Sequence, residues 1–272
     1  MNAITAVTHE DPYSYYASLP PIFFDDELGM WVAAHAETVT AVLTSEICRV
    51  APEGRSANGL ARLSDGDAHP PLRRAATDTV DAFANVREVA ETWAARLDLP
   101  LEEFAYALPV RTVATLLGIG EDLTPLVREC AQAIFGGGAA TMLGLLVQAC
   151  DATAGLIGNT LLANGPSVEE VLRLDSPVQN TRRYVAEDGV VAGMQMRKGD
   201  AILAVLAAAN RDPDANERIF TFGVGPHACP GQHVAVAIAE AGVAELRRRG
   251  VRLERPVQYR PSLNARIPFV RQ

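Results

Sequence analysis

One short loop, residues 222–231, constrains this chain more than any other stretch. It places Cys229 after a glycine-punctuated segment and directly before residues 234–246, which have the long apolar pattern of a helix. Glycines early in the loop allow backbone angles that other residues avoid, so the loop can approach a flat ligand closely. Pro230 suits the first turn of that helix, whose positive end favours a charged sulfur. The loop therefore predicts a thiolate site, and such a thiolate is a strong axial ligand for haem iron.

Two other interpretations of Cys229 stay open at this point. A single cysteine in an intracellular protein is most often a small buried hydrophobic residue. Zinc is the second alternative, because His227, Cys229 and His233 lie close together in the sequence. A structural zinc site needs four ligands at recognised spacings, and this chain has no Cys-x-x-Cys pair.

The complete pattern Phe-Gly-x-Gly-x-His-x-Cys-x-Gly is far more specific than its cysteine alone. It resembles the haem-binding loop of the cytochrome P450 family, with every signature position filled. The resemblance implies that Cys229 is the proximal ligand of haem b, that Phe222 packs beside it, and that His227 meets a haem propionate. Gly223 and Gly231 complete the cofactor-binding part of the loop.

Two further segments resemble the family's propionate-binding residues. His69 and Arg73 have the spacing of a family His-x-x-x-Arg at a helix start, where both side chains grip a propionate. A solvated arginine pair, Arg73 and Arg74, is the alternative. Arg183 matches the family's second propionate arginine, with Arg182 as the near alternative. Arginine suits a carboxylate because its planar fork donates two bonds at once.

The apolar segment 147–153 resembles the family's oxygen-activating helix, in which an acid and the following threonine deliver protons. Asp151 keeps the acid, and Asp151 and Thr153 are the candidate catalytic residues. Ala152 stands at the position of the usual threonine, and Thr153 lies on a different face of the helix. A partly solvated helix residue is the alternative for Asp151. The segment therefore predicts a weakened proton relay.

Two explanations compete for Glu170. Ser167 and Glu170 have the pattern of a capping box, which would hold the carboxylate on the backbone. Alternatively, Glu170 and Arg173 lie on one helix face and pair. The second resembles the family's Glu-x-x-Arg, which braces the core behind the haem loop. We favour it because the match runs continuously through residues 169–179; residues 210–213 match another recurrent family segment.

The resemblance covers nearly the whole chain and implies a mainly α fold with small β-sheets (α+β), a truncated cytochrome P450-like fold. We expect a single domain over residues 1–272, including a β-hairpin over 22–33. The chain lacks roughly a third of the usual family length. Only residues 131–141 separate two long helical patterns where the lid helices are expected, so we predict a compact member without them.

Composition argues against several classes of protein. The chain has 33 acidic and 24 basic residues and a net charge of −9, which disfavours a nucleic-acid or anionic-membrane surface. Its four cysteines are scattered and match no disulfide framework, and its start has no signal-peptide pattern. Residues 142–163 are apolar, but their polar side chains favour a buried helix over a membrane span. We expect a cytoplasmic protein with reduced thiols.

The function implied by the resemblance is oxidation of a small organic molecule, in specialised natural-product metabolism, by a haem-thiolate oxidoreductase. It would act as a monooxygenase with a ferredoxin-type electron donor or as a peroxygenase, since peroxide needs less of the proton relay. A redox-neutral haem enzyme (dehydration, isomerisation or rearrangement) and a non-catalytic haem sensor or partner subunit are the alternatives. Without lid helices, we expect a second copy or a partner protein to cover the distal face.

Overall fold

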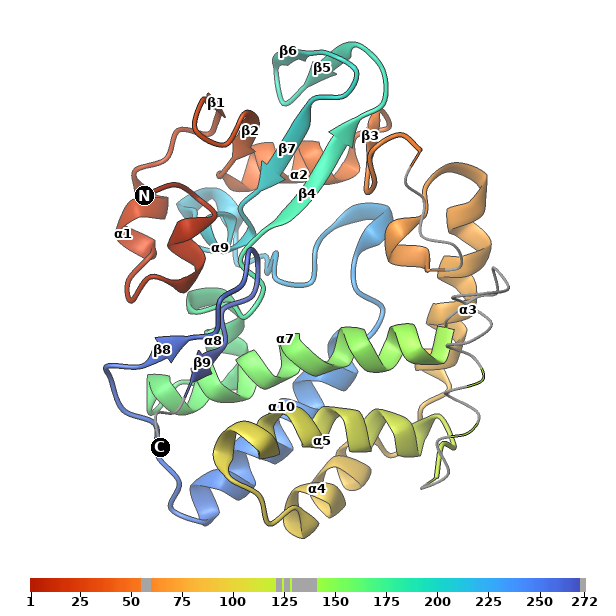
Figure 1. Cartoon of the computed structure of the whole chain (residues 1–272), viewed down its shortest axis with the longest axis vertical. Helices are drawn as coiled ribbons and strands as arrows, with labels where there is room; N and C mark the ends of the chain where they lie inside the picture. Colours follow the sequence, from red (N-terminus) through yellow and green to blue (C-terminus); the bar gives the residue numbers. More distant parts are fainter. Residues whose placement is uncertain (55–59, 121–123, 125–127, 129–140, 270–272) are drawn as a thin grey trace. The chain divides into compact units, whose positions relative to one another are not determined.

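The computed structural model describes residues 1–54, 60–120, 124, 128 and 141–269 (Figure 1). The predicted shortened link, residues 131–141, lies almost entirely outside these residues. Helices make up most of the regular structure and the sheets are small, so the predicted mainly α class is confirmed.

The chain forms two compact units, and each draws on three separate segments. The prediction of a single domain stays a prediction. Unit 1 consists of Met1–Ser56, Leu172–Cys229 and Gln258–Arg266, and unit 2 of Ala57–Val171, Pro230–Val257 and Ile267–Gln272.

Unit 1 is built on a five-stranded sheet of order β1-β2-β7-β4-β3. The first two strands form the predicted hairpin, with Ile22 opposite Ala33. The β2–β7 pair is parallel, whereas β7–β4 and β4–β3 are antiparallel. A separate hairpin joins β5 to β6. The strands are β1 (Ile22–Asp25), β2 (Met30–Ala33), β3 (Cys48–Arg49), β4 (Thr181–Val185), β5 (Gly189–Val191), β6 (Met194–Met196) and β7 (Ala201–Ala204).

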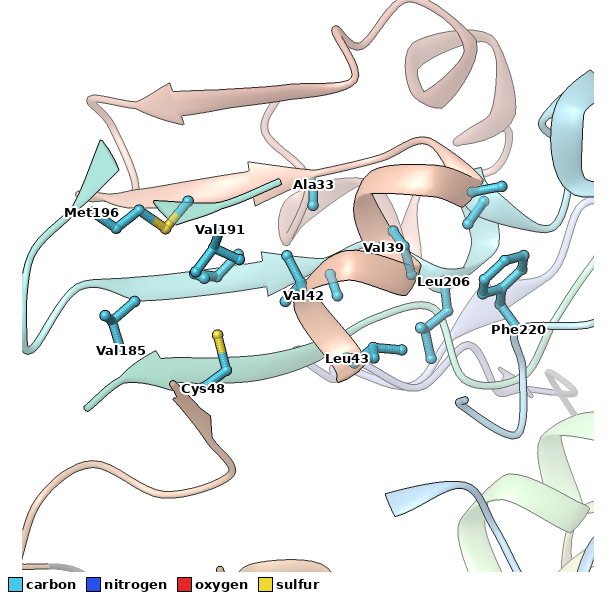
Figure 2. Packing of buried hydrophobic residues seen from close by; sticks show 14 of the residues in the cluster. Ala33, Val39, Val42, Leu43, Cys48, Val185, Val191, Met196, Leu206 and Phe220 are labelled. Carbon is cyan, nitrogen blue, oxygen red and sulfur yellow. The ribbon is translucent and has the colours of Figure 1, made fainter. Parts of the chain in front are cut away.

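One hydrophobic cluster lies between this sheet and helix α2 (Ala36–Thr44), as Figure 2 shows. Val39, Val42 and Leu43 share one face of α2 because they are spaced three and four residues apart, and all three are buried. Phe220 belongs to the same cluster and is fully buried. Burying a side chain of this size contributes about 1.5–3 kcal/mol. Phe220 thereby anchors the start of the cysteine loop in the core of unit 1.

Unit 2 is helical, and its long helix α7 packs against both α5 and α10. Gly242 of α10 allows this close packing. A Cβ atom there would come within 2.7 Å of Leu108 Cδ2 and 3.1 Å of Ile157 Cδ1, on the two neighbouring helices. The helices are α3 (His69–Asp81), α4 (Val86–Arg96), α5 (Leu101–Leu116), α7 (Thr141–Ala163) and α10 (Gln232–Arg248).

Part of α7, Met142–Ala163, is long and apolar enough to cross a membrane, with a mean hydropathy of 1.3. The same test is passed by core helices of soluble proteins, and 61% of its most apolar window is buried in the structure. This burial favours the predicted core helix. The remaining elements with helical or strand geometry are α1 (Tyr13–Ala17), α8 (Val168–Leu174), α9 (Leu206–Ala209), β8 (Gln258–Tyr259), β9 (Pro268–Phe269) and several 3₁₀ turns.

Candidate functional site

The cysteine loop leaves the core of unit 1 at Phe220 and ends at Cys229. Its first turn is closed by a 2.7 Å hydrogen bond from the Gly223 N–H to the Phe220 carbonyl. A second 2.7 Å bond, from the Cys229 N–H to the Phe222 carbonyl, joins the two ends of the loop. Gly223 has a φ of +69°, a left-handed conformation that glycine adopts without cost. The closed loop leaves Cys229 exposed and outside any disulfide, so its sulfur is accessible to a ligand.

Gly225 sets the loop directly against the end of α2. Its φ is +76°, and a Cβ atom there would lie 2.9 Å from Thr44 Cγ2 and 3.3 Å from the Leu43 carbonyl oxygen. The short 3₁₀ turn that follows, Gly225–His227, leaves the His227 ring half-buried. Only glycine combines this backbone conformation with so close an approach.

We expect Gly225→Ala to lower the free energy of unfolding by about 2–4 kcal/mol, since backbone strain and overpacking act together. Gly29→Ala is the matched control, because Gly29 has a φ of +63° but nothing within 4 Å of the added methyl group. The control should lose only about 1–2 kcal/mol in urea denaturation. Equal losses in the two variants would contradict the close approach.

The helix after the loop begins later than predicted. α10 starts at Gln232 and Gly231 is its N-cap residue, so Pro230 lies before the helix and not in its first turn. Cys229 is therefore three residues ahead of the first helical residue. The apolar pattern from residue 234 onward indicated the helix but could not locate its cap, since end positions depend on backbone geometry.

Arg183 lies in β4 and is only 7% exposed, whereas Arg182 is half-buried. The Nη1 atom of Arg183 donates to the Arg182 carbonyl oxygen at 2.9 Å. Arg183 also lies near Cys48: burial raises the pKa of the Cys48 thiol, and the Arg183 charge partly opposes this rise. Of the two candidate arginines, Arg183 is the buried one, and a buried cation requires acceptors for its hydrogen bonds.

His69 and Arg73 lie one turn apart at the start of α3, where Pro70 and Pro71 occupy the first turn. His69 is buried. This burial, and next the charge of Arg73, lowers the pKa of the His69 imidazole. At neutral pH His69 is therefore neutral and can donate a hydrogen bond from one ring nitrogen.

Asp151 and Thr153 lie on α7 and have different surroundings. Thr153 is 1% exposed, whereas Asp151 and Ala152 are half-buried. Successive helical residues are rotated by about 100°, so Thr153 cannot take the place of a hydroxyl at position 152. The predicted difference between the two faces is confirmed.

Glu170 forms the capping box and not the favoured pair with Arg173. The Ser167 N–H donates to Glu170 Oε2 at 3.0 Å, and the Glu170 N–H donates to Ser167 Oγ at 3.2 Å. Glu170 and Arg173 are both exposed, and the ion pairs formed by the described residues do not include this one. The capping box satisfies two backbone N–H groups at the start of α8 that would otherwise lack acceptors.

Five of the candidate residues belong to unit 1, four in the loop and Arg183 in the sheet. The others belong to unit 2: His69 and Arg73 on α3, Asp151 and Thr153 on α7, and Gly231 before α10. Among the described residues, no three His, Cys, Asp or Glu side chains are placed to hold a metal ion, so the zinc alternative gains no support there. The roles of the candidate residues stay predictions.

The known proteins to which the chain is similar are cytochromes P450, the family whose haem-binding loop the cysteine loop resembles. A putative cytochrome P450 140 of Mycobacterium tuberculosis is 41% identical over 90 residues, 28% of this chain and 20% of the relative. The biotin biosynthesis cytochrome P450 of Bacillus subtilis is 31% identical over 185 residues, 57% of this chain and 42% of the relative. Among solved structures, ligand-free CYP164A2 of Mycobacterium smegmatis has a TM-score of 0.77 and 20% identity, covering 98% of this chain and 96% of that chain. In sequence and in fold the chain is similar to proteins of the cytochrome P450 family.

The fold of the chain is also similar to that of P450 RauA, solved with a biosynthetic intermediate of aurachin RE. The TM-score is 0.76 at 21% identity, covering 95% of this chain and 94% of that chain. No protein-family model matches the chain. The chain spans between 20% and 42% of the length of these two curated relatives.

Similarity to the cytochrome P450 family implies a haem iron cofactor, and the donors of unit 1 fit one. The exposed sulfur of Cys229 suits a soft axial ligand to iron. Arg183 and His227 carry N–H groups of the kind that bind carboxylates. The resemblance had already indicated each of these residues: Cys229 and His227 through the loop motif, and Arg183 through its match to the family's second propionate arginine.

Proposed function

We propose that this chain is a haem-thiolate oxidoreductase of the cytochrome P450 type, which binds haem b through Cys229 and oxidises a small organic molecule. The observation that carries the proposal is the closed loop, which exposes Cys229 while hydrogen bonds fix both of its ends. When bound, thiolate-ligated haem supplies iron that is rich in electron density and favours oxygen–oxygen cleavage. The residues of unit 1 that would hold the haem are Phe222, Gly223, His227, Cys229 and Arg183. Roles for Gly231, His69 and Arg73 in unit 2 stay predictions from the resemblance.

Hydrogen peroxide is the oxidant that this chain's own residues favour. Asp151 is the one predicted proton-transfer group with access to solvent, because position 152 carries a methyl group and Thr153 is buried on another face. Peroxide brings both the oxygen atom and the oxidising equivalents, so that RH and H₂O₂ give ROH and water. Less proton delivery is then required of the protein than with dioxygen and two separate electrons.

Peroxide should support turnover of an added organic substrate in the purified haem protein, whereas NADH with a ferredoxin system should support little. Ala152→Thr should raise dioxygen-dependent turnover by at least about tenfold, because it restores the missing hydroxyl beside Asp151. Ala149→Thr, also half-buried on α7, is the control and should change neither rate. Efficient turnover with NADH and ferredoxin, together with none on peroxide, would contradict the peroxide mode.

A place in specialised metabolism is supported by the names of two related proteins. RauA was solved with a biosynthetic intermediate of aurachin RE, and a relative from Bacillus subtilis is named pulcherriminic acid synthase. The alternative of a redox-neutral haem enzyme is distinguished by product formation under strict exclusion of oxygen and peroxide. A ferredoxin-type donor, and a second copy or partner over the distal face, stay predictions.

A further inference from the structure

A buried polar network joins the end of α8 to the start of the cysteine loop. Its three side chains are Ser176, Asn210 and Thr221, which are 1%, 1% and 6% exposed. They come from three separate places in the sequence: just after α8, at the end of α9, and immediately before Phe222. Polar groups buried this deeply destabilise a fold unless they are hydrogen-bonded to one another or to the backbone.

The network is centred on the hydroxyl of Thr221. Thr221 Oγ1 lies 2.6 Å from the Leu172 carbonyl oxygen, to which it donates, and 2.9 Å from Ser176 Oγ. Asn210 Nδ2 donates to Thr221 Oγ1 at 2.9 Å and to the Leu172 carbonyl at 3.2 Å. Ser176 in turn donates to the Val178 carbonyl at 2.7 Å. The Thr221 hydroxyl thus links the start of the loop to Leu172 in α8 and to Asn210 at the end of α9.

The same network continues into the backbone of the loop. The Phe220 N–H donates to Asn210 Oδ1 at 2.5 Å, and the Phe220 ring is held in the core shown in Figure 2. The Phe220 carbonyl accepts the bond from Gly223 that closes the first turn, and the Phe222 carbonyl accepts the bond from Cys229. An unbroken series of hydrogen bonds and adjacent residues therefore leads from the Leu172 carbonyl to the Cys229 amide.

We propose that Asn210 and Thr221 are positioning residues for Cys229, holding the start of the loop so that the sulfur is fixed for ligation. The inference rests on the proposed haem ligation. It also reassigns the bracing role that the resemblance gives to Glu170 and Arg173, because those two side chains are exposed while Asn210 and Thr221 are buried and bonded.

Thr221→Val tests this, because valine keeps the shape and removes the hydroxyl. Thr160→Val is the matched control: Thr160 is also buried and donates to a carbonyl, that of Leu156, at 2.7 Å within α7. In the full chain without haem, amide hydrogen exchange at Gly223 and Cys229 should be about tenfold faster in Thr221→Val and unchanged in Thr160→Val. Thr221→Ser keeps the hydroxyl and should exchange like the wild type.

With haem bound, the ferrous carbon monoxide spectrum gives a second readout. Thr221→Val should show a several-fold larger share of the neutral-ligand band than either Thr160→Val or Thr221→Ser. Equal exchange rates and equal spectra in the two valine variants overturn the positioning role. A wild type without the thiolate band overturns the proposed ligation instead, and the exchange rates still decide the positioning role. If Thr221→Val does not fold, Ser176→Ala, which removes one neighbour of the hydroxyl, supports the same comparison.

Discussion

Replacing Cys229 with serine should abolish the thiolate signature of the bound haem and all oxidative turnover. A serine hydroxyl stays protonated at neutral pH and offers a harder, weaker ligand than a thiolate. The free energy of unfolding should change by less than about 0.5 kcal/mol, because Cys229 is exposed and its backbone N–H still closes the loop on Phe222. The effect is therefore expected on ligation and not on folding.

The measurement is the absorption spectrum of the ferric protein and of the reduced protein under carbon monoxide. Cys150→Ser is the control, since Cys150 is half-buried on α7 and lies outside the loop, and it should retain the strongly red-shifted Soret band. Retention of that band in Cys229→Ser would contradict ligation by Cys229. A wild type that binds no haem would show that the loop persists without its chemistry, and a scaffold role would then replace the catalytic proposal.

Local patterns in the sequence predicted the elements that depend on near neighbours. The hairpin of β1 and β2 follows from two apolar runs separated by turn-forming residues, and the start of α3 follows from Pro70 and Pro71. The cysteine loop was predicted because its glycines are required by its own backbone, as the positive φ values of Gly223 and Gly225 confirm. In each case the evidence lies within a dozen residues.

The sequence did not predict the hydrogen bonds of side chains that have two competing partners nearby or a partner far along the chain. Glu170 fits two patterns at once. In the structure its carboxylate accepts from the Ser167 N–H, and its own N–H donates to Ser167 Oγ, so the capping box forms in place of the pair with Arg173. Asn210 lies in a segment that was recognised without a role, because its acceptor at Leu172 is 38 residues away. No period or motif encodes which distant carbonyl a buried amide will contact. The strongest such case is Arg266.

Arg266 joins three segments of unit 1 although it is 0% exposed. A guanidinium has five N–H groups, and the acceptors that surround Arg266 match them in number. Its Nε donates to Asp175 at 2.8 Å, Nη1 to the carbonyls of Val7 at 3.1 Å and His9 at 2.6 Å, and Nη2 to the Glu10 carbonyl at 2.9 Å and the Tyr259 hydroxyl at 2.7 Å.

Arg266→Met should therefore lower the free energy of unfolding by about 3–5 kcal/mol, because the partly buried carboxylate of Asp175 loses its cationic partner and three backbone carbonyls lose the N–H groups of Arg266. Arg248→Met is the control: its ion pair with Glu245 is 2.7 Å long, but the Arg248 side chain is 71% exposed. Exposed pairs contribute little to stability because water screens them, and Glu245 keeps its bond to Arg249. Urea denaturation measures both losses, and similar losses would contradict the special role of Arg266.

Arg266→Lys separates the charge from the geometry of the fork. Lysine keeps the positive charge opposite Asp175 but has only three donors for the five acceptors, and its ammonium cannot lie flat between them. We expect it to lose more than half as much stability as Arg266→Met. A lysine variant as stable as the wild type would mean that charge alone holds the amino-terminal segment to the rest of unit 1. The planar guanidinium predicts the opposite, because Nη1 donates to the carbonyls of Val7 and His9 while Nη2 donates to that of Glu10. A single ammonium group cannot reproduce this arrangement.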